Sequence, residues 1–213
     1  MRARGTVVGV AALLLTLVTG CGEEKGSGAA SEAPARLRAA GAPSEGGRRF
    51  SCPVESAHGR VTMALVLPPG FRPGHREDYS SPGPGGFCVW EHEVTTHDES
   101  GPYRETVVVT LTGGNSSHEL QEQYDDQKGD LVPDGEPEGD DSVLSLELHH
   151  DVPTYGGIAG ERLDEWCYCD GQNTISRSVL ADGVQLGYGS VHSLVRQADR
   201  EFARILATAG RVR

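Results

Sequence analysis

Residues 174–190 read TISRSVLADGVQLGYGS, and this stretch indicates the fold class more clearly than any other part of the chain. The dipeptide Asp182-Gly183 separates two runs, 174–180 and 184–190, that are rich in β-branched and apolar residues. Asp-Gly between such runs favours a tight β-hairpin, because both turn positions need a positive φ. The stretch therefore predicts an antiparallel hairpin close to the C-terminus.

Further strands are predicted upstream of this hairpin. The clearest is 60–67, where apolar residues alternate until Pro68, Pro69 and Gly70 end the run. In the next run, 87–95, Cys88 and Trp90 share a face, which predicts an indole packed against a disulfide. The remaining strands are expected at 106–112, 143–149 and 161–169.

Two helices complete the predicted fold. Asn115 or Ser116 can cap a short helix that runs to about Gln127, and Ser193 can cap a longer one that Gly210 ends. The longer helix has an apolar face at helical spacing, made of Leu194, Ala198, Phe202, Ile205 and Ala209. The sequence thus predicts an α+β fold, a mostly antiparallel β-sheet packed with one short internal helix and a C-terminal amphipathic helix.

The first 21 residues differ sharply from this domain. Arg2 and Arg4 precede an apolar run at 7–18, and small residues then lead to Cys21, an order typical of a secretory signal. The run is too short for the roughly 20 residues that span a bilayer. A cysteine directly after the cut resembles the lipobox of bacterial lipoproteins. That resemblance implies removal of residues 1–20 and a diacylglycerol on Cys21; an ordinary secreted protein is the alternative.

Residues 22–49 consist of Gly, Ala, Ser, Pro and charged residues, with Leu37 as the only large aliphatic side chain. Such a segment buries too little apolar surface to fold, so a flexible tether is predicted, with its ends on the order of 30 Å apart. Residues 50–213 then have the size of a single domain. The expected location is the outer face of the cytoplasmic membrane, where the N-terminal lipid provides the anchor.

The charge of the chain excludes one class of partner. The formal net charge is −12, and losing Arg2 and Arg4 makes it more negative still, which argues against nucleic acid. Acidic residues gather at 129–141, where Pro and Gly punctuate the chain. A calcium loop is one interpretation of this segment, but its spacing lacks the pattern of an EF-hand. A solvated acidic loop is the other interpretation.

Four cysteines remain once Cys21 is assigned to lipid: Cys52, Cys88, Cys167 and Cys169. An even number in an exported domain predicts disulfides, with three possible pairings. Cys167 and Cys169 would share a strand face, with their Cα atoms about 6.5–7 Å apart, at the limit for a relaxed bridge. The favoured pairing therefore joins Cys52 and Cys88 each to one member of the Cys167/Cys169 pair.

Several short motifs together resemble a family. They are the lipobox, the tether, Leu67-Pro68-Pro69-Gly70-Phe71, Cys88-Val89-Trp90, and a late hairpin that leads into a C-terminal helix. This combination is similar to small uncharacterised lipoproteins of high-GC Gram-positive bacteria, several of which have a sheet-and-helix sandwich like the Mog1/PsbP group. The resemblance implies no catalytic residues. Cys167-Tyr168-Cys169 and the acidic loop have no counterpart in it.

Candidate sites are few. Cysteine and histidine ligands of the kind zinc prefers occur at Cys88, Cys167, Cys169 and His92, and at His149-His150, but their spacing is a weak zinc signature. Trp166 and Tyr168 alternate with Cys167 and Cys169 and so face away from their sulfurs. They either pack under a helix or bind a ligand together with residues 156–160.

The sequence therefore predicts a lipid-anchored envelope protein with no catalytic residues, metal or cofactor. Its expected role is to bind a small-molecule ligand or another envelope protein. A metal-dependent extracytoplasmic enzyme that uses Cys/His ligands or the acidic loop is the alternative.

Overall fold

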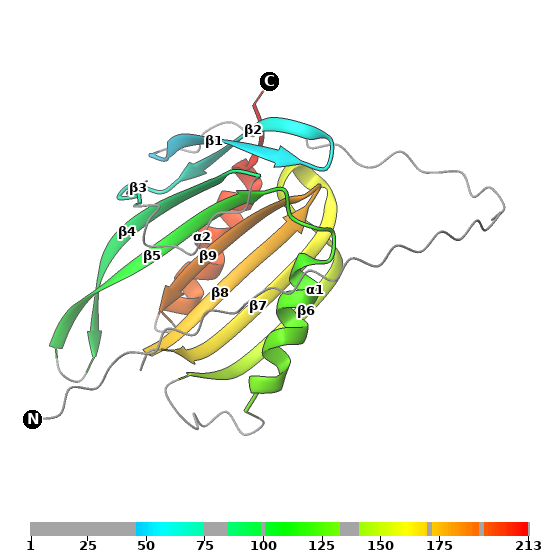
Figure 1. Ribbon diagram of the computed structural model, residues 1–213. Helices are drawn as coiled ribbons and strands as arrows, with labels where there is room; N and C mark the ends of the chain where they lie inside the picture. Colours follow the sequence, from blue (N-terminus) through cyan, green and yellow to red (C-terminus); the bar gives the residue numbers. More distant parts are fainter. Residues whose placement is uncertain are drawn as a thin grey trace, which may run out of the picture. The chain divides into compact units, whose positions relative to one another are not determined.

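The computed structural model describes residues 46–74, 85–98, 101–132, 141–169, 172–191 and 194–212. Two antiparallel sheets make up most of this part of the chain, one of three strands and one of seven (Figure 1). The predicted signal segment, Cys21 and most of the tether lie outside the described residues. So do Ser193 and residues 133–140 of the acidic loop.

The small sheet has the order β1-β2-β10 and the large sheet the order β3-β4-β5-β9-β8-β7-β6. The strands are β1 (Arg48–Ser56), β2 (Gly59–Leu67), β3 (Arg72–Pro73), β4 (Phe87–Asp98), β5 (Gly101–Gly113), β6 (Asp141–Pro153), β7 (Ala159–Cys169), β8 (Gln172–Ala181), β9 (Val184–Val191) and β10 (Gly210–Arg211). The helices are α1 (Glu119–Gln127) and α2 (Val195–Thr208), with 3-10 turns η2 (Lys128–Asp130) and η3 (Tyr155–Gly157). Each predicted strand is present, and the α+β class is roughly consistent with a structure that is mostly strand.

The Asp182-Gly183 hairpin is confirmed and forms the β8–β9 connection near the middle of the large sheet. Both turn residues have positive φ values, 50° and 72°. Tyr155 is fully buried and braces this turn: its hydroxyl donates to the Ala181 carbonyl oxygen at 2.6 Å and accepts the Ala181 N–H at 3.2 Å. The same hydroxyl also contacts the Val184 carbonyl oxygen.

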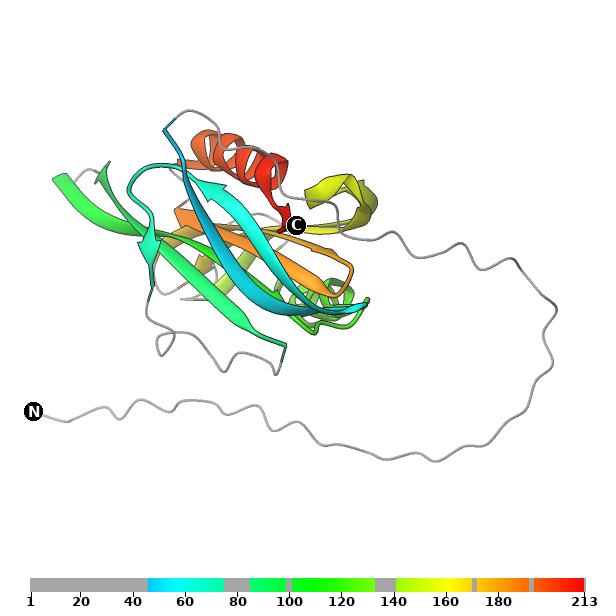
Figure 2. The same ribbon diagram turned by 90° about the horizontal axis from the view of Figure 1, so that it is seen from above.

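The two helices cover opposite faces of the large sheet (Figure 2). On one face, Phe202 and Ile205 of α2 join buried residues of both sheets in the main core. On the other face, Leu120 of α1 packs with Leu163 and Leu180 in a smaller cluster. Neither helix in the described ranges is long and apolar enough to span a membrane.

Two local predictions were wrong. Helix α1 begins at Glu119 and has no side-chain cap: the Asn115 amide donates to the Thr112 carbonyl at 3.0 Å, and Ser116 Oγ accepts the His118 N–H, which precedes the helix, at 3.3 Å. Strand β1 was not predicted, and it begins at Arg48, inside the segment predicted as tether. β1 is an edge strand, a position in which the backbone tolerates Pro53.

The favoured disulfide pairing was also wrong. Cys52 is bonded to Cys88, with Cα atoms 6.0 Å apart, and Cys167 to Cys169, with Cα atoms 5.5 Å apart. Strands β5, β9 and β8 lie between β4 and β7. Four strand spacings of about 4.8 Å therefore place Cys88 roughly 19 Å from Cys167, far beyond the Cα separation of about 7 Å that a disulfide can bridge.

Candidate functional site

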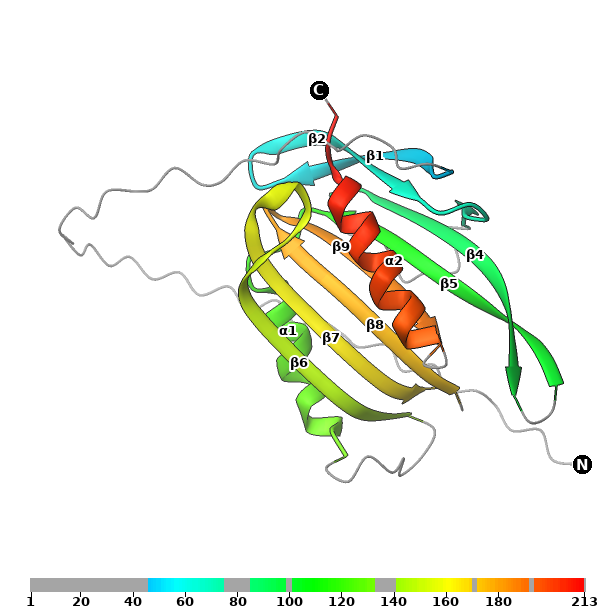
Figure 3. The ribbon, with the colours of Figure 1, turned by 180° about the vertical axis from the view of Figure 1, so that it is seen from behind.

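A surface hollow of about 170 Å³ lies on the α2 face of the large sheet. Helix α2 runs over β8 and β9 on this face and leaves β7 and β6 without a helix above them (Figure 3). The lining includes Ser145 and Glu147 of β6, Asp164 and Trp166 of β7, Arg177 of β8, and Val195 of α2.

Strand register brings the charged residues of the hollow into one row. Glu147 pairs with Asp164 across β6 and β7, and Asp164 pairs with Arg177 across β7 and β8. Paired residues in neighbouring antiparallel strands point to the same face, about 5 Å apart. Three separate strands thus contribute two carboxylates and a guanidinium to a continuous polar strip.

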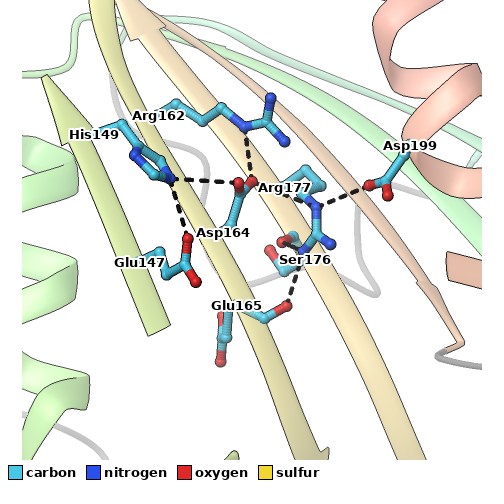
Figure 4. A network of polar contacts seen from close by, with 8 residues as sticks. All are labelled: Glu147, His149, Arg162, Asp164, Glu165, Ser176, Arg177 and Asp199. Carbon is cyan, nitrogen blue, oxygen red and sulfur yellow. Dashed lines mark hydrogen bonds and ion pairs between the residues drawn. The ribbon is translucent and has the colours of Figure 1, made fainter. Parts of the chain in front are cut away.

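Arg177 is the centre of this strip (Figure 4). Its Nε lies 3.4 Å from Asp164 Oδ1 and 3.3 Å from Asp199 Oδ1, and its Nη1 donates to the carbonyl oxygens of Glu165 and Ser176. The side chains of Arg177 and Asp164 are only 13% and 19% exposed. Partly buried charges of this kind need several partners to offset their lost hydration. The network fixes the relative positions of β7, β8 and α2.

The outer part of the strip carries an excess of negative charge. Arg162 Nε donates to Asp164 Oδ1 at 2.8 Å, and His149 Nε2 lies 3.4 Å from Glu147 Oε2. The two arginines of the network face three carboxylates, those of Glu147, Asp164 and Asp199, as Figure 4 shows. With a neutral imidazole the network has a formal charge of −1, and the 66% exposed Glu147 is the carboxylate without an arginine partner in the described contacts.

Of the predicted ligand-binding residues, the structure brings only Trp166 to the hollow. Its Nε1 lies 3.2 Å from the Asn173 side-chain oxygen, and its ring packs against the main core. Tyr168 lies on the same strand face but does not line the hollow. Residues 156–160 lie at the other end of β7, about 20 Å from Trp166 at the usual rise of a strand, so the predicted grouping was wrong.

The cysteines and histidines considered as metal ligands are not brought together. Cys88 is bonded to Cys52, and His92 packs against the Phe71 ring at 5.2 Å. His149 and His150 contact carboxylates on opposite faces of the sheet, those of Glu147 and Glu161. In the ranges that the structure describes, no three or more His, Cys, Asp or Glu side chains are grouped so as to hold a metal ion.

Arg177 and Asp164 were missed at the sequence level, although a signal was present. Arg177 stands two positions from both Ile175 and Val179 in a predicted strand, so the three side chains share a face. Its charge is therefore placed on the apolar face of that strand. Asp164 lies in the middle of another predicted strand. Charged residues within strands are rarely buried without a partner, so the two could have been proposed as a pair.

No protein-family model matches this sequence, and no curated protein matches it. The function of the protein is therefore inferred from the residues of the hollow and from the N-terminal sequence.

Proposed function

We propose that the protein is a lipid-anchored binding protein of the cell envelope, attached through Cys21 to the outer face of the cytoplasmic membrane. The hollow beside Trp166 is the observation that carries this proposal, because an indole, an exposed carboxylate and a fixed ion-pair network meet there. Such a pairing of apolar surface with a few placed polar groups is typical of small-ligand sites.

The size of the hollow limits what it can hold. A volume of about 170 Å³ equals that of five or six water molecules at about 30 Å³ each. Sites for drug-sized ligands are larger, about 300–1,000 Å³. The hollow therefore suits one small head group, and a larger ligand would extend out of it.

The polar atoms of the hollow favour a cation. The described contacts of Arg177 go to the carboxylates of Asp164 and Asp199 and to two backbone carbonyls. This leaves as acceptors the Ser145 hydroxyl and the Glu147 carboxylate, whose Oε2 lies 3.4 Å from His149 Nε2. The Trp166 ring can add a cation–π contact. The net charge of −12 also attracts cations from a distance. A protonated amine is thus the best-matched ligand group.

The disulfides and the N-terminus support an extracytoplasmic location. Both cysteine pairs among the described residues lie at bonding distance, as is common in exported proteins. The basic start, the apolar run and Cys21 supply an export signal with an acylation site.

Calorimetry with three compounds of matched length tests the binding proposal on the full chain in detergent. The compounds are 1,4-diaminobutane, butane-1,4-diol and succinate, which differ mainly in charge. We expect saturable binding of the diamine, several-fold weaker in Glu147→Gln because one charged acceptor is lost. The matched control is Glu122→Gln on α1, which covers the opposite face and should bind as the parent does. Preference for succinate, or saturable binding of none of the three, would contradict the proposal.

The anchor is tested separately with Cys21→Ala. The variant should carry no lipid mass, because it lacks the cysteine that would be acylated. Without acyl chains to hold it on the membrane, it should be released or retained as a precursor. Lipid mass on the variant, or membrane retention of a processed variant that carries neither lipid nor residues 1–20, would rule out Cys21 as the anchor.

A further inference from the structure

The two disulfides differ in how far apart their cysteines lie in the sequence. Cys52 and Cys88 are separated by 36 positions and link the small sheet to the large one, whereas Cys167 and Cys169 are separated by 2. The entropy that a cross-link removes from the unfolded chain grows with the logarithm of loop length. The Cys167–Cys169 bond therefore constrains the unfolded chain very little, and stability alone gives a weak reason for it.

The two cysteines of this bond also differ in exposure. Cys167 is 5% exposed, while Cys169, at the end of β7, is partly exposed. On the α1 side of the sheet, Glu165 bonds to Gln127, the last residue of α1, and Leu131 beyond the helix bridges to Val143, the register partner of Cys167. Cys169 lies two residues farther along β7, so an attacking thiol can reach Cys169 more easily than Cys167.

A hydroxyl group is positioned to stabilise the departing sulfur. Thr174 Oγ1 lies 3.2 Å from Cys167 Sγ, across the β7–β8 pairing. A hydrogen bond donated to a thiolate favours its charged form and improves it as a leaving group.

We propose that Cys167–Cys169 is an exchangeable disulfide that reacts with an external dithiol, independently of ligand binding in the hollow. A thiolate of the dithiol attacks Cys169 Sγ, a new S–S bond forms, and the old bond breaks with its electron pair on Cys167, where Thr174 stabilises the thiolate. The second thiol of the dithiol, once deprotonated, attacks its own half of the mixed disulfide and releases Cys169 as a thiolate. Both cysteines then take up protons, and the dithiol leaves oxidised.

The Cys52–Cys88 bond is an internal control for this reaction. Cys52 is 0% exposed and belongs to the main core, and its partner Cys88 is partly buried and packs against that core. Attack at Cys88 would have to release the Cys52 thiolate into the apolar core, where desolvation disfavours its charge, so this bond should remain oxidised while the chain is folded.

The test treats the folded full chain in detergent with dithiothreitol, stops the reaction with N-ethylmaleimide, and maps the labelled cysteines by peptide mass. We expect Cys167 and Cys169 to be labelled at least tenfold faster than Cys52 and Cys88. Equal rates for the two pairs, earlier opening of Cys52–Cys88, or labelling of Cys167 and Cys169 without reductant would overturn the proposal.

Two further readouts test the direction of attack and the role of Thr174. With the monothiol glutathione, the mixed disulfide should form on Cys169; an adduct on Cys167 instead would contradict the proposed attack. Thr174→Val should slow the reduction several-fold, whereas Thr174→Ser keeps the hydroxyl and should restore the rate. Equal rates in all three forms would exclude Thr174 as a positioning residue.

Discussion

The α2 face of the large sheet divides into a covered half and an open half. In the covered half, side chains of β5, β9 and β8 such as Val109 and Leu186 are fully buried beneath α2 and the small sheet. In the open half, Glu147, Asp164 and Trp166 of β6 and β7 face the hollow. The strands alternate in the same way in both halves, so the layer above them determines which side chains are tolerated. Where no layer covers the sheet, the chain can carry charges and a ligand site.

The largest expected effect is in the covered half. Phe202→Ala removes a ring of the main core and should lower the free energy of unfolding by about 3–5 kcal/mol, because the cavity left behind is only partly filled. The measurement is urea denaturation followed by circular dichroism. Arg200→Ala, on the exposed side of the same helix, is the matched control and should change stability by less than about 0.5 kcal/mol. Similar losses in both variants would mean that α2 does not seal this half.

The two disulfides extend the comparison to cross-links. Replacing Cys52 and Cys88 by alanine should cost about 4 kcal/mol in the chain-entropy picture, and replacing Cys167 and Cys169 less than about 2 kcal/mol. Urea midpoints of the two double variants give the difference. If loss of Cys167–Cys169 destabilised the fold more, that bond would be structural and the contrast between the pairs would fail.

Substituting Arg177 measures how much its ion pairs, which connect the open half with α2, contribute to stability. Arg177→Met removes one of the two guanidiniums that contact the partly buried Asp164, the other being that of Arg162, and should cost about 2 kcal/mol, the scale of a lost charged hydrogen bond. Adding Asp164→Leu should recover part of this loss, because the carboxylate that lost a partner is then gone and only Arg162, which is 34% exposed, loses its ion pair. A double-mutant cycle measures the coupling, and strictly additive effects would show that the pair is not coupled.

Substituting Glu165, on the α1 face, is expected to change the free energy of unfolding by a smaller amount that depends on pH. Desolvation raises the pKa of its carboxyl, and a hydrogen bond from Gln127 opposes this. The folded state therefore binds this proton more tightly than the unfolded state does. The resulting contribution to the free energy of unfolding is complete below the ordinary glutamate pKa and is lost as the pH rises through the higher pKa of the folded state. Glu165→Gln should therefore stabilise the fold by about 0.5–1 kcal/mol at pH 7 and by almost nothing at pH 4.

An unpaired acceptor beside Glu165 explains the expected gain. The Gln127 Oε1 atom is buried and has no hydrogen-bond partner; a glutamine amide at position 165 or a protonated Glu165 could donate to it, whereas the carboxylate cannot, so the gain is confined to higher pH. Thermal melts of both forms across this pH range make the test. A gain that is equal at both pH values would exclude ionisation of Glu165 as its cause.

Much of the fold could be predicted because strand periodicity and turn chemistry are local. Asp182-Gly183 predicted a hairpin that the structure confirms, and the apolar spacing of Ala198 and Phe202 predicted the buried face of α2. Strand β1 was missed even though Phe50 and Val54 alternate with polar residues; Pro53 within the run weakens its strand signal.

The disulfide pairing and the hollow could not be predicted because both depend on the order of strands in the sheet. The order places β4 and β7 far apart, and it brings Glu147, Asp164 and Arg177 into one row. The spacing of residues in the sequence indicates neither the separation of β4 from β7 nor this row of charged residues. Trp166 was proposed from its residue type and strand face alone, so its place beside Arg177 is new information from the structure.

One tryptophan of the chain lies in each half, so a single experiment can test whether the ligand binds in the open half. Trp90 is buried in the main core, and Trp166 lines the hollow. The measurement is fluorine NMR of the 5-fluorotryptophan protein titrated with 1,4-diaminobutane, with the Trp166 resonance assigned from Trp166→Phe. We expect a saturable shift of the Trp166 resonance, while the Trp90 resonance stays in place. A diamine that moves both resonances equally, or neither, would contradict a binding site in the open half.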